Sequence, residues 1–236
     1  MTNRRHRRVD RPRTFPRLHV LTDADQQLDD LRVVDAALAG GAPAIQVRIK
    51  GRTDHEHLAI ARAIVARCRA AGAMCVVNDR VDLALAAGAD AVHLGLTDLP
   101  IADARTLAGD RLLIGGTARD PRTAARLVAD GADYLGVGPT FTTHTKDGLP
   151  APLGPGGVAA VVAAVDVPVI AIAGIDATRL PAVLATGAHG IAVVGAVTAT
   201  DDPAAAVREL LAGLDDTRLA DPELGDRASD GTGAER

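Results

Sequence analysis

The sequence has very few aromatic residues and very few cysteines. Phe, Tyr and Trp together make up 1% of the 236 residues, and Trp is absent. Single-stranded nucleic acids stack on aromatic rings, so a stacking platform of that kind is not expected here. The two cysteines, Cys68 and Cys75, form no CxxC motif and have no histidine at zinc-ligand spacing. We therefore expect two buried free thiols.

Long apolar runs and excess positive charge are also missing. The formal net charge is −4, which disfavours binding to a nucleic-acid backbone. No apolar run is long enough to cross a bilayer, and the basic N-terminus lacks the apolar stretch of a secretory signal. We therefore expect a cytoplasmic protein with neither a nucleic-acid nor a membrane partner.

Lysine is almost absent, and arginine supplies nearly all of the positive charge. Lys50 and Lys146 are the only lysines. The two residue types are not equivalent, because an ammonium group is a compact point charge and a guanidinium group is a planar fork. The two positions that keep lysine are therefore candidates for specific ionic contacts.

Apolar residues make up 47% of the chain, enough for a large core built from Val, Leu, Ile and Ala. Strand-like apolar runs alternate with segments of helical period. Several of the runs are continuously apolar, which is typical of parallel strands covered on both faces. The strand-like runs are 18–22, 44–49, 74–78, 91–94, 112–115, 134–138, 167–173 and 190–194. The helical segments are 28–39, 54–70, 81–87, 101–108, 120–130, 155–164, 177–185 and 203–213.

This alternation predicts an α/β fold, a single (β/α)₈ TIM barrel over residues 18–214. The alternative, an open doubly wound sheet, would need fewer strands or an edge break. The Arg-rich residues 1–17 are predicted to form a disordered basic arm. The acidic residues 215–236 are poor in apolar side chains and are predicted to form a disordered tail.

In such a barrel, function lies at the carboxyl ends of the strands and in the loops that follow them. Strand alternation places Gln46, Arg48 and Lys50 on one side of the second strand. If that side faces the barrel interior, two cations in a nearly dry space require an anion. A diphosphate matches a guanidinium fork and a point charge. The alternative is a set of exposed side chains in solvent.

Two aspartates follow neighbouring strands. Asp79 comes directly after the run 74–78, and Asp98 comes shortly after the run 91–94. Two carboxylates, completed by diphosphate oxygens and water, form a usual magnesium site. The alternative for each is a helix-cap or loop residue.

Other polar residues follow the later strands. Thr117 offers a hydroxyl group in a stretch of small residues, although a tight turn explains that stretch equally well. The long segment 138–148 carries four threonines and Lys146, a pattern typical of a functional, anion-binding loop. Gly174 and Gly195 end the last two strands, where many barrels bind phosphate. His55 and His57 are predicted at the surface, and His93 in the core.

Taken in order, these motifs resemble the thiamine phosphate synthase family, and the resemblance covers nearly the whole core. No P-loop, GxGxxG, HExxH or GxSxG motif points elsewhere. The matching pieces are Gln46-x-Arg48-x-Lys50, Val77-Asn78-Asp79-Arg80-Val81-Asp82, His93-x-Gly95-x-x-Asp98, Gly138-Pro139 leading to Thr143-x-Thr145-Lys146, Ile172-Ala173-Gly174-Ile175 and Ala192-Val193-Val194-Gly195.

The resemblance implies two substrates, an aminopyrimidine diphosphate and a thiazole phosphate. Asp79 and Asp98 would bind one Mg²⁺ per subunit, and Thr117 would assist at the pyrimidine. The residues implied at the diphosphate are Arg48, Lys50, Asn78 and Lys146, with Gln46 nearby. Val47, Ile49 and His144 are also implied to contact substrate. Those implied at the thiazole phosphate are Thr143, Thr145, Gly174, Val194 and Gly195. The implied catalytic set is Arg48, Lys50, Lys146 and Thr117.

The implied reaction needs no protein nucleophile. Loss of diphosphate gives a pyrimidine carbocation, and the thiazole nitrogen attacks it. The resemblance also implies that copies of the chain associate, and it leaves open whether the thiazole is carboxylated. The sequence departs from the family at four positions. Members of the family often have Ser where this sequence has Thr117 and where it has Gly195. They usually have Gly where it has Ala173, and often have Glu where it has Thr97.

Three other functions fit parts of the pattern. A thiazole tautomerase shares the fold but has no use for magnesium or diphosphate, so the two aspartates and the two lysines argue against it. A non-catalytic barrel that binds thiamine-pathway phosphates would use the same residues without turnover. A generic phosphate-binding barrel enzyme would not need Arg48 together with Asp79 and Asp98.

Overall fold

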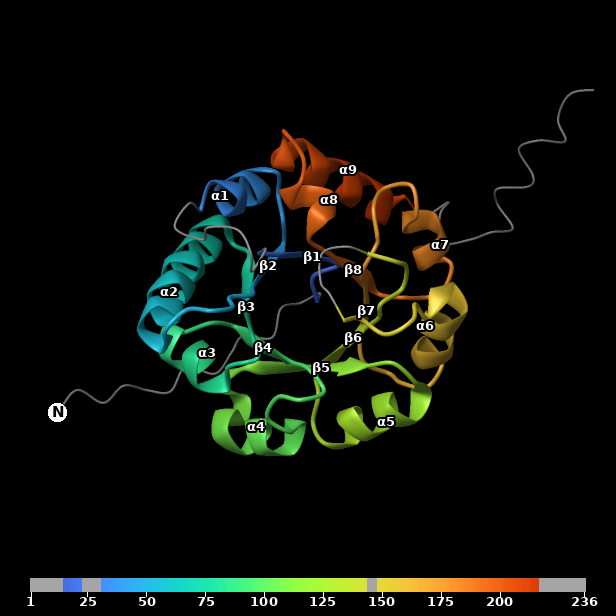
Figure 1. Ribbon diagram of the computed structural model, residues 1–236, viewed down its shortest axis with the longest axis horizontal. Coiled ribbons are helices and arrows are strands. Elements are labelled where there is room, and N and C mark those ends of the chain that lie inside the picture. Colours follow the sequence, from blue (N-terminus) through green and yellow to red (C-terminus); the bar gives the residue numbers. More distant parts are fainter. Residues whose placement is uncertain (1–14, 23–30, 144–147, 217–236) are drawn as a thin grey trace, which may run out of the picture.

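The computed structural model describes residues 15–22, 31–143 and 148–216. Eight parallel strands in chain order close into a barrel, with β1 paired to both β2 and β8, and helices surround it (Figure 1). The predicted TIM barrel is therefore confirmed. The strands are β1 (Leu18–Leu21), β2 (Ala44–Val47), β3 (Met74–Asn78), β4 (Ala91–Leu94), β5 (Leu113–Ala118), β6 (Tyr134–Val137), β7 (Val169–Ile172) and β8 (Gly190–Val193).

The helical segments lie where the sequence predicts them, with one addition. The additional helix is α8 (Gly195–Thr198), which is too short to show a helical period. The others are α1 (Arg32–Ala39), α2 (Asp54–Ala71), α3 (Val81–Ala87), α4 (Ile101–Ala108), α5 (Pro121–Ala129), α6 (Gly154–Val162), α7 (Leu180–Leu184) and α9 (Pro203–Asp215), with a 3₁₀ turn η1 (Gly109–Arg111).

Strand alternation divides the core into two layers. Outward-facing residues such as Ile45 and Val77 pack in one large cluster beneath the helices. Inward-facing residues fill the barrel itself, with Val76 in one small cluster and Tyr134 and Ile170 in another. The inward layer separates the two ends of the barrel. We call the end at which the strands finish the mouth, and the opposite end the floor.

Phe15 and Arg17 close the floor. The Phe15 ring lies 4.8 Å from the Tyr134 ring, centroid to centroid. The Arg17 carbonyl accepts a hydrogen bond of 2.8 Å from the Ile191 amide, and Arg17 Nε donates to the His189 carbonyl at 3.0 Å. Phe15 and Arg17 therefore pack on the barrel, although both lie before the predicted boundary after residue 17. The rest of the predicted arm, 1–14, and residues 217–236 of the tail lie outside the described residues.

Two expectations about individual side chains can be checked here. Cys68 and Cys75 are buried free thiols, as predicted. His57 is not a surface residue, because only 7% of it is exposed. It shares the buried face of α2 with Ala61, Ile64 and Cys68, at the spacing of successive helical turns. No described helix is long and apolar enough to cross a membrane.

Candidate active site

The segment that leaves β2 brings two cationic residues to the mouth. Its alternation continues past the strand, since Val47 and Ile49 are buried in the outer cluster and Gln46 is buried on the inner side. Arg48 and Lys50 follow Gln46 on that side, and both are at least partly exposed. The Val47 and Ile49 side chains pack against the helices, so a substrate contact at these two positions would come from the main chain, and it stays a prediction.

Thr22 at the end of β1 holds this segment in place. Its hydroxyl accepts a hydrogen bond of 2.8 Å from the Arg48 amide and donates one of 3.0 Å to the Arg48 carbonyl. Both main-chain polar groups of Arg48 are thus satisfied by one side chain. The Arg48 backbone is therefore fixed where its segment reaches the mouth.

Asp79 forms the centre of a tight turn after β3. The Arg80 amide donates to the Asn78 carbonyl at 2.8 Å, which is the hydrogen bond of a γ-turn, and Asp79 has a φ of +66°. Its carboxylate accepts hydrogen bonds from Lys50 Nζ at 2.5 Å and from Asn78 Nδ2 at 2.5 Å. Lys50, Asn78 and Asp79, which come from two strand ends, therefore meet as predicted.

Asp98 joins this group from the loop after β4. Its Oδ2 accepts a hydrogen bond of 2.7 Å from the Gly95 amide. A Cβ atom on Gly95 would lie 3.0 Å from that same oxygen, so glycine suits this position. A side-chain hydrogen bond links Asp98 to Asp79. The two predicted metal ligands therefore converge at the mouth.

The two carboxyl groups have opposite pKa shifts. Burial and the adjacent Asp79 carboxylate raise the pKa of Asp98, although the Gly95 amide opposes them. Burial alone would raise the pKa of Asp79, but hydrogen bonds with Lys50 and Asp98 hold that pKa below its usual value. Two carboxylates this close repel each other when both are ionised, and a divalent cation between them would relieve that repulsion.

The described residues contain no group of three or more His, Cys, Asp and Glu side chains that would hold a metal. The two carboxylates therefore stand as a pair. That donor set fits Mg²⁺, which is commonly bound by one or two carboxylates and completed by water and substrate phosphate oxygens.

Thr117 on β5 faces the barrel interior and contacts His93 on β4. His93 Nε2 lies 3.0 Å from the Thr117 hydroxyl oxygen. Burial lowers the pKa of His93 to about 4, so the ring is neutral near pH 7. A Cβ atom on Gly136 would lie 2.8 Å from the ring, and glycine leaves room for it. His93 is only partly buried, so its predicted core position is borne out in part, and its contact with Thr117 places it in the site, which the sequence did not reveal.

The segment after β6 packs on the end of β7. The Thr140 amide donates to the Ile172 carbonyl at 2.8 Å, and the Phe141 amide donates to the Ala173 carbonyl at 3.1 Å. A Cβ atom on Gly174 would lie 2.5 Å from the Thr142 carbonyl oxygen, so this approach requires glycine. Thr140 was not predicted in the site. It is fully buried, and its hydroxyl has no hydrogen-bond partner among the described residues.

The predicted thiazole-phosphate residues fall on adjacent strand ends. Ile172 is in register with Ala192, so Gly174, Val194 and Gly195 follow neighbouring strands at the mouth. Thr143 is partly buried. His144, Thr145 and Lys146 lie outside the described residues, and their roles stay predictions.

A family model described as thiamine monophosphate synthase matches residues 18–197, which span all eight strands. The chain belongs to the thiamine monophosphate synthase family. A relative named thiamine-phosphate synthase from Salinispora arenicola (strain CNS-205) is 46% identical over 84% of this chain and 97% of its own length. A second relative of that name, from Chloroflexus aurantiacus, is 45% identical over 83% of this chain and 91% of its own length.

One solved structure agrees with this family assignment, and a second shares the fold. A thiamine phosphate pyrophosphorylase from Pyrococcus furiosus superposes with a TM-score of 0.77 and 37% identity, covering 84% of this chain and 95% of the other. A 3-hexulose-6-phosphate synthase superposes with a TM-score of 0.65 at 21% identity, which shows the shared fold alone.

Proposed function

We propose that this chain is a thiamine phosphate synthase that joins an aminopyrimidine diphosphate to a thiazole phosphate and releases diphosphate. The observation that carries the proposal is the meeting of Lys50, Asp79 and Asp98 at one mouth, with Arg48 on the same side of its segment. Family membership supports it, as do relatives of that name over nearly their whole length.

The leaving group determines what the site must do. The bond between the pyrimidine methylene carbon and the diphosphate oxygen breaks, and both electrons leave with the diphosphate. The species that gains charge in the transition state is therefore an anion, which favours fixed cations at that position. Lys50 and Arg48 would bind the diphosphate oxygens, and Asn78 and Lys50 orient the Asp79 carboxylate through their hydrogen bonds.

Asp79 and Asp98 would hold one Mg²⁺. When bound, that ion would neutralise charge on the diphosphate and act as a Lewis acid. The two carboxyl groups lie together, and the pKa of Asp98 is raised. Both observations support this choice of ligands.

The second half of the reaction forms the new carbon–nitrogen bond. The thiazole nitrogen donates its electron pair to the pyrimidine methylene carbon, so no covalent enzyme intermediate is required. Thr117, held by His93, would face the pyrimidine from β5. The main chain at Gly174, Val194 and Gly195 would bind the thiazole phosphate. The reaction is an alkyl transfer, and these residues position and shield the two substrates.

A coupled assay tests the proposal against the tautomerase alternative. Purified protein is mixed with both substrates and Mg²⁺, and diphosphate and thiamine phosphate are measured together over time. We expect both products in equal amounts, and neither when EDTA replaces the metal. Isomerised thiazole without diphosphate release would instead assign a tautomerase. Tight binding of both substrates without any product would assign a binding protein.

A further inference from the structure

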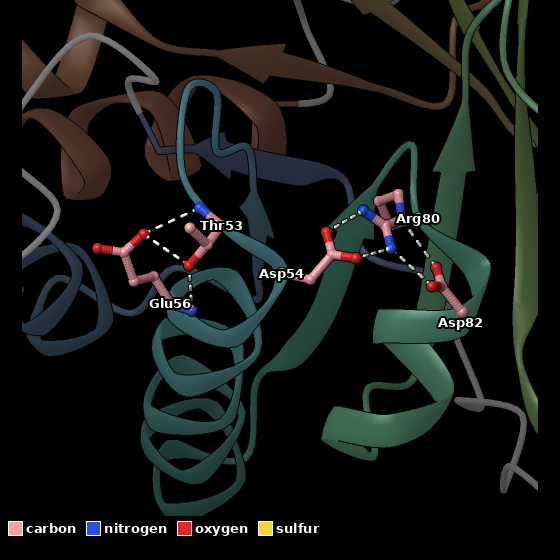
Figure 2. A network of polar contacts seen from close by, with 5 residues as sticks. All are labelled: Thr53, Asp54, Glu56, Arg80 and Asp82. Carbon is pink, nitrogen blue, oxygen red and sulfur yellow. Dashed lines mark hydrogen bonds and ion pairs between the residues drawn. The ribbon is translucent and has the colours of Figure 1, made fainter.

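Arg80 lies beside Asp79 and makes a network of its own outside the barrel mouth. Its guanidinium group donates to both oxygens of Asp54, at 2.6 and 3.0 Å, and to both oxygens of Asp82, at 2.9 and 2.7 Å. Figure 2 shows the guanidinium group between Asp54 at the start of α2 and Asp82 in the first turn of α3. We call these three residues the Arg80 clamp.

The clamp contains more hydrogen bonds than an ordinary surface ion pair. Isolated exposed pairs contribute little, whereas bidentate arginine–carboxylate pairs fix geometry. The hydrogen bonds from Arg80 lower the pKa of Asp54 and that of Asp82, so both stay ionised near neutral pH. With two carboxylates bound, the Arg80 charge is already compensated. Arg80 is therefore poorly suited to bind diphosphate itself.

The clamp adjoins a strained turn. Asp79 has a φ of +66°, in a region where non-glycine residues are uncommon, and it sits at the centre of a γ-turn closed by the Arg80 amide. Residues in such conformations persist only when their surroundings hold them there. The Arg80 side chain, bound on two sides, fixes the residue that ends the turn.

The clamp also fixes the loop that carries Lys50. Asp54 is the first residue of α2, and a capping box holds that helix end. The Glu56 carboxylate accepts from the Thr53 amide at 2.9 Å, and the Glu56 amide donates to the Thr53 hydroxyl at 3.3 Å (Figure 2). Lys50 lies only a few residues before this cap. Arg80 therefore joins the two loops whose residues Lys50 and Asp79 pair at 2.5 Å.

We propose that Arg80 is a positioning residue for the metal site. Its clamp on Asp54 and Asp82 holds the Asp79 carboxylate in the orientation at which it meets Asp98 and Lys50. The inference rests on the proposed function, because it requires Asp79 to be a metal ligand. It goes beyond that function by assigning the metal affinity of the site in part to a residue that touches neither metal nor substrate.

The test measures metal binding directly. Mn²⁺ is titrated into the full-length protein in the presence of diphosphate, and free Mn²⁺ is followed by electron paramagnetic resonance. For Arg80→Met we expect affinity to fall roughly tenfold, the usual effect of removing a residue that orients a metal ligand. Asp54→Asn and Asp82→Asn, which each weaken half of the clamp, are expected to give smaller losses. Arg80→Lys is not expected to restore affinity, since an ammonium group cannot replace the two-sided fork.

A matched control separates this role from a general structural one. Arg67 also joins two helices through an ion pair, donating to Asp35 at 2.8 Å, and its side chain is 39% exposed against 35% for Arg80. Arg67→Met is expected to bind Mn²⁺ as the wild type does. Thermal unfolding without metal is recorded for every variant, so that affinity is compared only among folded proteins. If Arg80→Met does not fold, Asp82→Asn carries the same test.

The outcomes distinguish the two proposals. Wild-type affinity in Arg80→Met, with or without a lower unfolding temperature, would overturn the positioning role. An equal loss in Arg67→Met would overturn it as well. Asp79→Asn reports on the metal site itself. If that variant binds Mn²⁺ as tightly as the wild type, the proposed metal site is wrong whatever Arg80 does.

Discussion

The mouth and the floor of the barrel use charged and polar side chains in different ways. At the floor, Arg17 donates to main-chain carbonyl groups, and His19 and His189 lie close to the Pro16 and Phe15 carbonyls, so these groups are satisfied within the protein. At the mouth, two carboxyl groups meet each other, and Asp79 and Ala173 have positive φ values. The floor therefore has contacts that serve stability, while the mouth keeps strained, mutually repelling groups that a ligand would satisfy.

Removing a carboxylate from the mouth should separate activity from stability most strongly. Asp79→Asn keeps a residue type that tolerates positive φ, so the turn is retained. We expect kcat/KM for thiamine phosphate formation to fall roughly a thousandfold, because a bound metal contributes several kcal/mol of charge stabilisation. The free energy of unfolding, measured in urea, should stay close to the wild-type value. Loss of folding together with activity would show that the mouth also carries the stability of the barrel.

A small change at the floor should have the opposite effect. A Cβ atom at Gly190 would lie 2.1 Å from the Arg17 carbonyl oxygen, and neither backbone segment can move freely. We expect Gly190→Ala to lower the free energy of unfolding by about 3 kcal/mol, the upper end of the usual cost of overpacking. kcat/KM per folded molecule should not change. A variant of wild-type stability with impaired turnover would remove the distinction between the two ends.

The pH dependence of stability should trace to the floor through His19. Burial, and then the nearby His93, lower the pKa of His19 to about 3 from its usual 6.5. The folded state holds the neutral ring. The contribution of His19 to the free energy of unfolding is therefore complete above pH 6.5 and is lost as the pH falls toward 3. In His19→Gln, the slope of the free energy of unfolding against pH should therefore be smaller than in the wild type between pH 4 and 6, by about 1.4 kcal/mol per pH unit. His55→Gln, at an exposed position, is the control. An unchanged slope in His19→Gln would show that other groups cause the acid sensitivity.

The smallest expected effect concerns strain at the mouth. Ala173 has a φ of +80°, a conformation that glycine adopts without steric cost. We expect Ala173→Gly to raise the free energy of unfolding by about 1 kcal/mol, since the left-handed region costs an alanine this much. Ala171→Gly, in strand β7, should lower it. Chemical denaturation of both variants checks the pair, and destabilisation by Ala173→Gly would show that Ala173 is not strained.

The barrel and the centre of the site could be predicted because they depend on local patterns. Continuous apolar runs define strands buried on both faces, and alternation along 46–50 places Arg48 and Lys50 at the mouth. The positions of Asp79 and Asp98 just after neighbouring strands then bring the two carboxylates together.

What the sequence did not reveal depends on contacts between distant residues. Arg80 belongs to a recognised motif and Asp82 lies two residues after it, but nothing in the sequence shows that Asp54 joins them until α2 and α3 are placed side by side. His57 has the polarity of a surface residue, and only its spacing with Ala61 and Ile64 indicates the buried face. Phe15 stands in an Arg-rich segment, and nothing local shows that its ring closes the floor.

The central claim is that Asp79 and Asp98 together bind a divalent cation at the barrel mouth. Anomalous diffraction from crystals grown with Mn²⁺ and diphosphate tests this claim most directly. We expect an anomalous peak between the two carboxyl groups, with diphosphate density in contact with Lys50. A peak elsewhere on the protein, with none between these aspartates under saturating metal, would contradict the claim.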